Sequence, residues 1–329
     1  MSDKIRIGFI GAGNIARGHA ARINDSGLGE VVALADPSER SLNNIRENRP
    51  ELAAVPVFAD YREMLDKVAL DAVEIHTPHC FHPGQILESL DRGLHVLCEK
   101  PLTSSVPDAH RVIAKRDETD KVLMISYQRH FVPAYRYMRD LAVGGKLGDL
   151  TTVALILTQG WLRNSAGTWR QNKEMSCGGQ LNDSGSHVVD MMLWCSGLRA
   201  KEVFAQMNSF HLDVDVDSAT TVRFEGGAIG NVTVLGSTPG YWEMFGIYGT
   251  EGSVAYDNVG GLVQQFVGGQ PERPELPEAS NNPDVNFMRA IRGEEEVEVP
   301  AECGLRVIEL TEAAWKSAEL NRPVAVASL

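Results

Sequence analysis

Two short segments of the chain place ionisable side chains where they could move a proton. Lys100 comes directly after an apolar segment, in the tetrapeptide Cys98-Glu99-Lys100-Pro101. A lysine at the carboxyl edge of a sheet can stabilise an alkoxide, or supply a proton if its pKa is lowered. Most lysines are solvated surface residues, but Pro101 restricts Lys100 to an extended backbone that would hold its side chain in place. We therefore expect Lys100 to be catalytic.

Asp183 and His187 form a second candidate pair, because they are four residues apart at the expected entry to a helix over 186–195. This spacing predicts that both side chains lie on one helical face. A histidine oriented by a carboxylate is a common proton acceptor, since imidazole titrates near neutral pH. The alternative is a buried structural histidine, because Met191 and Trp194 share that face with His187.

The segment 4–16 indicates how such residues would meet a cofactor, because it reads as a strand, a glycine turn and the start of a helix. The pattern Gly11-x-Gly13-x-x-Ala16 is typical of a dinucleotide-binding turn, where backbone N–H groups and the helix dipole favour a pyrophosphate. Asp36 ends a second apolar segment, 20 residues beyond Ala16, where a ribose-binding carboxylate is expected.

The cofactor expected from these residues is NAD. The Asp36 carboxylate would repel the 2′-phosphate of NADP. Arg40 is close enough in the sequence to leave NADP open.

Strand-like and helix-like segments alternate over residues 1–127, which predicts parallel pairing with right-handed crossovers in a doubly wound sheet. Ligands bind beyond the carboxyl ends of the strands in such sheets. The expected strand ends carry 11–16, Asp36, 77–82, 99–101 and 128–129. We expect 1–127 to be a dinucleotide-binding domain.

Residues 128–329 change character, with strand-like segments joined by turn glycines and few helices between them. This pattern predicts an α+β domain on an open, mostly antiparallel sheet, with a final helix at about 303–320. One open face of the sheet would suit a partner subunit, so we expect a homodimer or homotetramer. The segment 268–283, rich in Pro, Glu and Asn, reads as an exposed loop. The expected strands are 150–158, 202–207, 219–224, 229–235, 244–248 and 253–256.

The composition excludes several classes of partner. The chain has 329 residues, enough for two domains, and its 44 acidic and 31 basic residues give a net charge of −13. An acidic balance disfavours nucleic acids and anionic membranes, and no apolar stretch approaches the roughly 20 residues of a membrane span. The five cysteines lack the spacing of zinc or redox pairs, so we interpret them as reduced. We expect a cytoplasmic protein without a targeting segment that binds a small molecule.

Two further groups of residues are less specific. His76, His79 and His82 straddle a strand end and Pro78, so we expect no metal site there, because three ligands must converge on one point. Aromatic faces and arginines suit a polyhydroxylated or anionic ligand, although interface packing is equally consistent with them. The residues of this second group are Trp161, Arg163, Trp169 and Arg170.

Taken together, six motifs resemble the Gfo/Idh/MocA oxidoreductases, a family that includes glucose–fructose oxidoreductase and inositol dehydrogenase. The motifs run in family order and are Gly11-x-Gly13-Asn14-Ile15-Ala16, Thr77-Pro78-x-x-x-His82, Glu99-Lys100-Pro101, Gln128-Arg129-x-x-x-Pro133, Trp169-Arg170, and Gly178-Gly179 followed by Asp183-x-Gly185-x-His187. The resemblance implies an N-terminal Rossmann domain and a second domain that binds substrate.

The resemblance also implies roles for single residues. Lys100, Asp183 and His187 would act on a hydroxyl of a sugar or cyclitol while NAD or NADP takes the hydride. The expected cofactor-binding residues are Gly11, Gly13, Asn14, Ile15, Asp36, Thr77, Pro78, His82, Glu99, Lys100 and Gln128. The expected substrate-binding residues are Lys100, Arg129, Trp169, Arg170, Asp183 and His187.

The expected reaction is the reversible oxidation of a secondary hydroxyl, with His187 as base, Asp183 orienting it and Lys100 stabilising the alkoxide. His187 and Lys100 could exchange these roles. A glycosidase that uses NAD for transient oxidation and a non-catalytic dinucleotide-binding regulator are the alternatives. Two departures from the family pattern, His79 and Gln180, lie near the expected pocket and bear on the substrate more than on the reaction.

Overall fold

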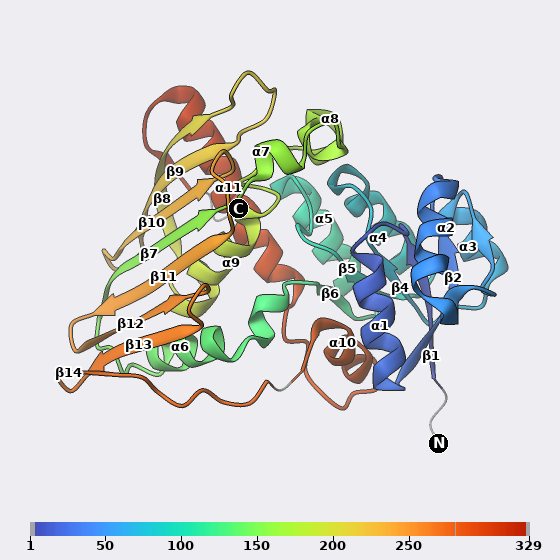
Figure 1. Ribbon diagram of the computed structural model, residues 1–329, viewed down its shortest axis with the longest axis horizontal. Coiled ribbons are helices and arrows are strands. Elements are labelled where there is room, and N and C mark those ends of the chain that lie inside the picture. The colour runs from blue at the N-terminus through green and yellow to red at the C-terminus, as the bar shows by residue number, and fades with distance from the viewer. Residues whose placement is uncertain (1–3, 280, 327–329) are drawn as a thin grey trace. The chain divides into compact units, whose positions relative to one another are not determined.

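The computed structural model describes residues 4–279 and 281–326, which divide into two compact units (Figure 1). Within the described residues, unit 1 comprises 4–103, 107–128 and 281–302. Unit 2 comprises 104–106, 129–279 and 303–326. Parts of the predicted ranges, namely residues 1–3, 280 and 327–329, lie outside the described residues.

Unit 1 is built on a six-stranded sheet in which every neighbouring pair is parallel. Its order is β3-β2-β1-β4-β5-β6, so the order reverses between β1 and β4. This topology confirms the predicted doubly wound sheet and places its ligand crevice beyond the carboxyl ends of β1 and β4. The strands are β1 (Ile5–Ile10), β2 (Gly29–Ala35), β3 (Val57–Phe58), β4 (Ala72–Ile75), β5 (His95–Cys98) and β6 (Leu123–Ile125).

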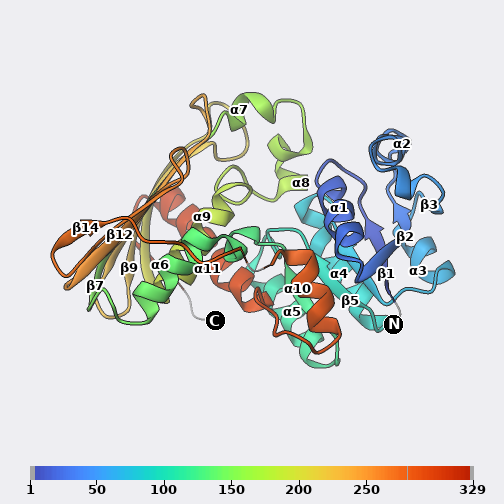
Figure 2. The ribbon, with the colours of Figure 1, turned by 60° about the horizontal axis from the view of Figure 1, so that its bottom comes forward.

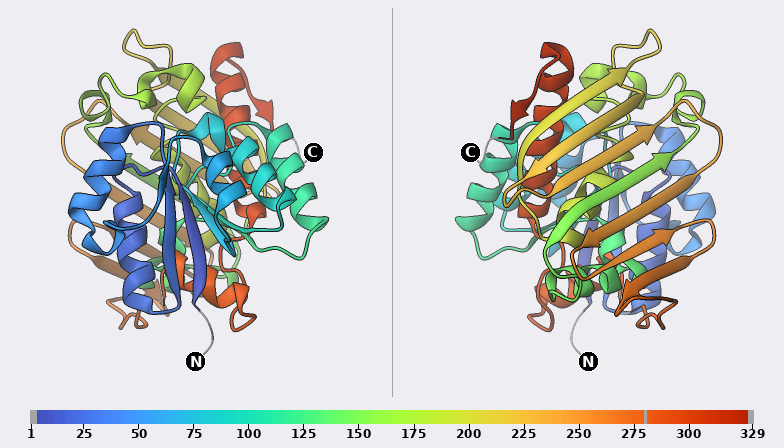
Figure 3. Two further views of the ribbon diagram at one scale, coloured as in Figure 1. Left: turned by 90° about the vertical axis from the view of Figure 1, so that its right-hand side faces the viewer. Right: turned by 90° about the vertical axis from the view of Figure 1, so that its left-hand side faces the viewer.

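Helices lie on both sides of this sheet (Figure 3). The first helix buries Ala16, Ala20 and Ile23, which recur on one face at helical spacing. The helices and single turns that belong to unit 1, wholly or nearly so, are α1 (Ala16–Ser26), α2 (Glu39–Asn48), η1 (Pro50–Leu52), α3 (Tyr61–Lys67), η2 (His79–Phe81), α4 (His82–Asp91), α5 (Val106–Asp117) and α10 (Pro283–Ile291).

Helix α10 is the main difference from the expected domain division, because the sequence predicts 128–329 as one domain. The side chain of Asn282 caps the helix by accepting from the Val285 N–H, and Pro283 occupies its first turn. Phe287 and Met288 are fully buried. The helix packs on α1, so this segment completes unit 1.

Unit 2 is built on a nine-stranded sheet with the order β14-β13-β12-β11-β7-β10-β9-β8-β15. Only β7 and β10 pair in parallel among the described strands, which confirms a mostly antiparallel α+β domain. The strands are β7 (Leu150–Thr158), β8 (Ala200–Asn208), β9 (Asp217–Phe224), β10 (Ile229–Leu235), β11 (Trp242–Gly249), β12 (Gly252–Asp257), β13 (Leu262–Val267), β14 (Gln270–Glu272) and β15 (Val324–Ala325).

The two faces of the nine-stranded sheet differ. Helices α6 (Pro133–Val143), α9 (Gly185–Ser196) and α11 (Ala301–Leu320) gather on one side of it (Figure 2). No helix of the described residues crosses the other face, which fills the right-hand view of Figure 3. The remaining short elements are η3 (Gln128–Phe131), α7 (Trp161–Asn164), η4 (Trp169–Gln171) and α8 (Lys173–Ser176).

The predicted loop 268–283 contains the short strand β14 and then runs without regular structure, largely exposed, from 273 to 279. Among the helices of the described chain, none combines the length and the hydropathy that a membrane crossing needs.

Candidate functional site

The two glycines of the turn between β1 and α1 have different surroundings. Gly11 packs against the backbone of His76, whereas Gly13 faces open space. Gly11 has a φ of 97°, and a Cβ there would lie 2.8 Å from the carbonyl carbon of His76, so only glycine fits. A Cβ at Gly13 would meet no atom within 4 Å. The protein's own packing therefore does not require glycine at position 13, whereas a pyrophosphate lying against the backbone would. Asn14 and Ile15 are exposed beside it.

Asp36 lies beside this turn at the end of β2. One carboxylate oxygen accepts the Ala12 N–H at 2.8 Å, and the other accepts the Ser38 N–H at 2.8 Å. These two bonds orient the half-buried carboxylate next to the glycine turn, where a ribose hydroxyl could reach it. Arg40 is exposed on α2.

The loops after β4 and β5 are tied together by His82, which the sequence predicts to touch the cofactor. Its Nδ1 lies 2.7 Å from the Pro101 carbonyl oxygen, and its Nε2 lies 2.9 Å from the Thr77 carbonyl oxygen. The side chain is fully buried, and burial lowers the pKa of His82, so the ring is neutral and donates to one of these carbonyls. Thr77 in turn donates to the Gln85 side chain at 2.6 Å. His82 thus positions Thr77, Pro78 and Pro101.

Lys100 lies half-buried at the carboxyl end of β5, and its peptide bond to Pro101 is cis. The preceding Glu99 is largely buried, with Oε1 3.1 Å from His19 Nε2. Burial alone would raise the pKa of Glu99, but the hydrogen bond and charge of His19 and the charge of Lys100 hold it well below its usual range. Glu99 is therefore an anion inside the unit, next to the Lys100 cation.

Gln128 is exposed at the end of unit 1, and Arg129 begins the long central segment of unit 2. The Arg129 guanidinium is largely buried, forms an ion pair with Glu243 at 2.6 Å and donates to the Tyr241 hydroxyl at 2.9 Å. Tyr135 also donates to Glu243. These contacts give the buried Arg129 side chain a structural role. Its contact with substrate stays a prediction.

In unit 2, Asp183 does not belong to the helix that carries His187, contrary to the expectation of one shared helical face. Helix α9 begins at Gly185, and a tight turn precedes it, in which the Asp183 N–H donates to the Gly179 carbonyl. The Gly185 N–H donates to the Gln180 carbonyl in the same turn. Asp183 is buried, whereas His187 is half-buried in the first turn of α9.

The Asp183 carboxylate is oriented by two residues of the segment between β7 and α9. Its Oδ2 accepts the Trp161 indole N–H at 2.8 Å and the Arg170 Nε–H at 3.0 Å. The Arg170 guanidinium stacks on Trp169, 4.5 Å from the ring centroid. The structure therefore brings Asp183 together with the predicted residues Trp169 and Arg170, and it adds Trp161.

Asp215, which is not among the residues predicted from the sequence, stabilises the turn before α9 by hydrogen bonds. Its carboxylate accepts the N–H groups of Gly179 at 3.1 Å and Leu181 at 2.8 Å, and the Trp315 indole N–H at 2.9 Å. A Cβ at Gly179 would lie 1.9 Å from the Asp215 carbonyl oxygen. No spacing rule in the sequence links Asp215 to a turn more than 30 residues away.

The three histidines of the β4 loop separate in the structure. Among the described residues, His76 forms a possible metal-ligand set with His19 and Glu74. His79 and His82 do not belong to that set. His79 and His82 contact each other edge to face, with ring centroids 5.8 Å apart.

Two models of one protein family match most of the chain. The model described as "Oxidoreductase family, NAD-binding Rossmann fold" matches residues 5–127. The model described as "GFO/IDH/MocA C-terminal domain" matches residues 135–255. The chain belongs to the Gfo/Idh/MocA family of oxidoreductases. Its N-terminal unit is the NAD-binding Rossmann domain of that family.

Curated relatives of this Gfo/Idh/MocA chain include dehydrogenases. Inositol 2-dehydrogenase of Corynebacterium glutamicum (strain R) is 30% identical over 205 residues, which are 62% of this chain and 57% of that protein. The chain thus matches little more than half the length of that relative. Levoglucosan dehydrogenase of Pseudarthrobacter phenanthrenivorans is 25% identical over 292 residues, 78% of this chain and 74% of that protein.

Solved structures of the Gfo/Idh/MocA fold superpose along the whole chain. A levoglucosan dehydrogenase in complex with NADH gives a TM-score of 0.89 at 20% identity, covering 99% of this chain and 100% of that one. At this identity the likeness establishes the fold of both domains.

Proposed function

We propose that the protein is an NAD-dependent dehydrogenase that transfers a hydride between a secondary hydroxyl of a sugar, sugar derivative or cyclitol and the nicotinamide. Membership of the oxidoreductase family supports the reaction class, and the names of the relatives, which refer to inositol and levoglucosan, support the substrate class. The observation that carries the proposal is the oriented Asp183 carboxylate in the turn before α9, four residues before His187 in the sequence.

The proposed reaction needs a base, a cation and a hydride acceptor. NAD bound in unit 1 would supply the hydride acceptor as the carbinol C–H bond breaks. His187 takes the hydroxyl proton, Asp183 stabilises the imidazolium that forms, and the Lys100 ammonium stabilises the developing alkoxide until the carbonyl is complete. The products are a ketone, NADH and one proton. This mechanism requires Lys100 and His187 to reach the same hydroxyl group.

The open side of Gly13 and the oriented Asp36 fit a dinucleotide in unit 1. We propose that Asp36 binds the ribose hydroxyls and selects NAD over NADP. The other proposed cofactor contacts are Gly11, Gly13, Asn14, Ile15, Thr77, Pro78, Glu99, Lys100 and Gln128, with His82 acting through the loops. The proposed substrate contacts are Lys100, Arg129, Trp169, Arg170, Asp183 and His187. The proposed domains are 1–127 for the cofactor, together with the α10 segment, and the remainder of 128–329 for the substrate.

A screen of sugars and cyclitols by nicotinamide absorbance, with NAD and NADP in parallel, tests this function. We expect reduction of NAD with at least one secondary alcohol of this class. Release of free sugar from a glycoside without net nicotinamide reduction would instead indicate a glycosidase. Binding of NAD with no turnover of any substrate would indicate a dinucleotide-binding regulator.

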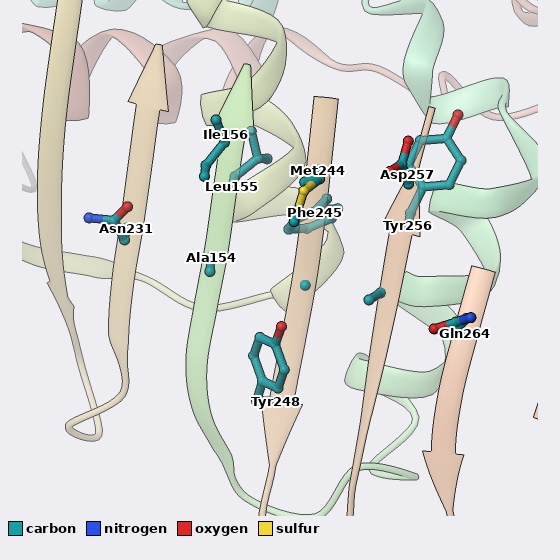
Figure 4. Close-up of a pocket in the computed structure, with 12 residues that line it drawn as sticks. Ala154, Leu155, Ile156, Asn231, Met244, Phe245, Tyr248, Tyr256, Asp257 and Gln264 are labelled. Carbon is teal, nitrogen blue, oxygen red and sulfur yellow. The ribbon is translucent and has the colours of Figure 1, made fainter. Parts of the chain in front are cut away.

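We also propose that the chain forms a homodimer or homotetramer through the uncovered face of the nine-stranded sheet. Large apolar side chains stand exposed there, among them Met244 at 40%, Tyr248 at 41% and Phe266 at 48%. Figure 4 shows the hollow on this face, where Ile156, Met244 and Tyr248 project from β7 and β11. Exposed apolar patches of this kind mark subunit contacts.

We propose a cytoplasmic location, which is consistent with the five cysteines being free in the structure.

A further inference from the structure

A closed cluster of ionisable side chains inside unit 1 has no part in the proposed reaction. At its centre is Glu74 on β4, whose side chain is fully buried. Neither oxygen of its carboxylate accepts a hydrogen bond. A buried carboxylate without donors is costly, by several kcal/mol in general, unless a positive charge compensates it. The cluster therefore calls for a cation at Glu74.

His76 brings Nε2 next to Glu74 without a hydrogen bond between them. Its Nδ1 lies 3.4 Å from the Gly11 carbonyl oxygen. In the neutral tautomer whose Nδ1–H faces that carbonyl, Nε2 carries the lone pair, and it lies 3.3 Å from Glu74 Oε2. Nε2 has no hydrogen-bond partner and is buried. Two lone pairs at this distance repel each other unless a positive species lies between them.

His19, in the second turn of α1, brings a second ring nitrogen to the same point. Its Nδ1 lies 3.2 Å from Glu74 Oε2 and 2.8 Å from Asp284 Oδ1. The ligand atoms of His19, Glu74 and His76 all lie within 4.8 Å of one another. Metal–ligand bonds of about 2.0 Å in a tetrahedral site place neighbouring ligand atoms about 3.3 Å apart. Both measured separations from Glu74 match that edge length.

The outer nitrogens of both rings are held as they are in protein metal sites. A histidine ligand donates its other N–H to a carboxylate or a backbone carbonyl, which fixes the ring. Here the outer nitrogen of His19 lies 3.1 Å from Glu99, and that of His76 faces the Gly11 carbonyl.

We propose that His19, Glu74 and His76 bind a divalent transition-metal ion of the Zn²⁺ class. Two imidazole nitrogens favour Zn²⁺ over Mg²⁺ or Ca²⁺, which prefer oxygen ligands. Charge supports the assignment. Glu74, Glu99 and Asp284 are three carboxylates, and Arg22, which pairs with Asp284, balances one of them. The charge of Lys100 acts on Glu99, and a metal ion bound by the imidazoles, in place of the proton that otherwise charges His19, would balance Glu74.

The bound ion would join α1 and β4 behind the glycine turn, so its role is structural. It neither touches the substrate nor takes part in hydride transfer. The metal proposal is therefore independent of the proposed function.

Metal retention after refolding tests this site, because its closed position makes exchange through the native protein slow. The full-length chain is unfolded with a chelator, refolded with Zn²⁺ or with the chelator, and gel-filtered before metal analysis. We expect one zinc per chain and a higher thermal midpoint in the zinc-refolded sample. Co²⁺ in place of Zn²⁺ should give a visible ligand-field band. Glu74→Gln and His76→Gln should each lower zinc retention at least tenfold.

Cys303→Ser is the matched control, because His130, Asp190 and Cys303 form the other possible ligand set among the described residues. This variant should retain one zinc. Wild-type protein that refolds without bound zinc in excess Zn²⁺ would overturn the proposal and would assign the missing charge to a proton. Retention unchanged in His76→Gln, or lost in Cys303→Ser, would also overturn it. If Glu74→Gln fails to fold, the wild-type stoichiometry and His76→Gln decide.

Discussion

At the scale of single residues, Arg170 has two candidate roles, which are orienting Asp183 and binding substrate. Its Nε donates to Asp183, and its guanidinium stacks on Trp169. Arg170→Gln removes the charge-assisted bond that orients Asp183, so we expect kcat to fall about tenfold or more with unchanged NAD affinity. Steady-state kinetics and NAD titration would measure both. Arg163→Gln, at an exposed position of the same segment, should behave like wild type. A change confined to KM would show that Arg170 binds substrate without orienting Asp183.

Asp36 decides the choice of cofactor in this account. In Asp36→Asn, the single amide oxygen can replace only one of the two carboxylate oxygens that accept from Ala12 and Ser38, and the negative charge that repels a 2′-phosphate is lost. We expect NAD to bind about tenfold more weakly and the preference for NAD over NADP to shrink. Fluorescence titration with both nucleotides measures this. Glu39→Gln, exposed in the first turn of α2, is the control. An unchanged preference in Asp36→Asn would rule out this role.

The sequence indicates candidate reactive residues more readily than the tertiary partners of those residues. Lys100 and His187 lie in short motifs, so they can be singled out from the residues adjacent to them in the sequence. The contact of Trp161 with Asp183 and the bonds from Asp215 to the Gly179 turn depend on tertiary packing. No local pattern encodes such contacts, which is why Asp215 escapes sequence analysis.

At the scale of elements, two glycines that look alike in the sequence have opposite surroundings. A Cβ at Gly13 would meet no protein atom, whereas a Cβ at Gly179 would collide with Asp215 at 1.9 Å. We expect Gly13→Ala to leave the thermal midpoint unchanged and to weaken NAD binding at least tenfold. We expect Gly179→Ala to lower the free energy of unfolding by about 2 kcal/mol or more, and to reduce kcat by displacing the turn before α9.

Thermal unfolding and NAD titration of both variants test this contrast. Each variant serves as the control for the other, because the substitution is the same. Tight NAD binding by Gly13→Ala would show that position 13 does not adjoin the pyrophosphate. A fully stable and active Gly179→Ala would show that Asp215 does not fix the turn.

Most periodic segments were predictable as elements, whereas β13, α6 and several short or proline-rich segments were not predicted. The alternating strands and helices of residues 1–127 and the first six strands of the second sheet follow from their hydropathy pattern. Helix α10 begins with Asn282-Pro283 at the end of a segment rich in Pro and Glu, so composition masks it. Strands β14 and β15 have three and two residues and take their structure from pairing with neighbours.

At the scale of the whole molecule, the chain crosses between its two units more than once. Sequence order predicts one boundary near residue 127, and the first unit is nearly complete there. Segment 281–302 returns to unit 1 because Asp284, Phe287 and Met288 are buried only by packing on that unit. A division of the sequence at a single boundary cannot assign segment 281–302 to unit 1.

The uncovered sheet face gives a prediction at this scale. Met244 is 40% exposed in the hollow of Figure 4, so Met244→Glu places a charge in the proposed subunit contact. We expect the oligomer to dissociate toward monomer, because a buried unpaired charge is costly. Sedimentation velocity measures the change, and Lys146→Glu, at an exposed site outside the hollow, should leave assembly unchanged. A wild-type monomer, or an intact Met244→Glu oligomer, would contradict this interface.

The most direct test of the proposed mechanism is single-turnover hydride transfer by Lys100→Met, followed by NADH absorbance, with NAD affinity measured on the same sample. We expect Lys100→Met to bind NAD like wild type, while hydride transfer slows by about 10²-fold or more, because the alkoxide loses its cation. Lys201→Met, at an exposed site in unit 2, should transfer hydride normally. Unchanged hydride transfer in Lys100→Met would contradict the proposed mechanism.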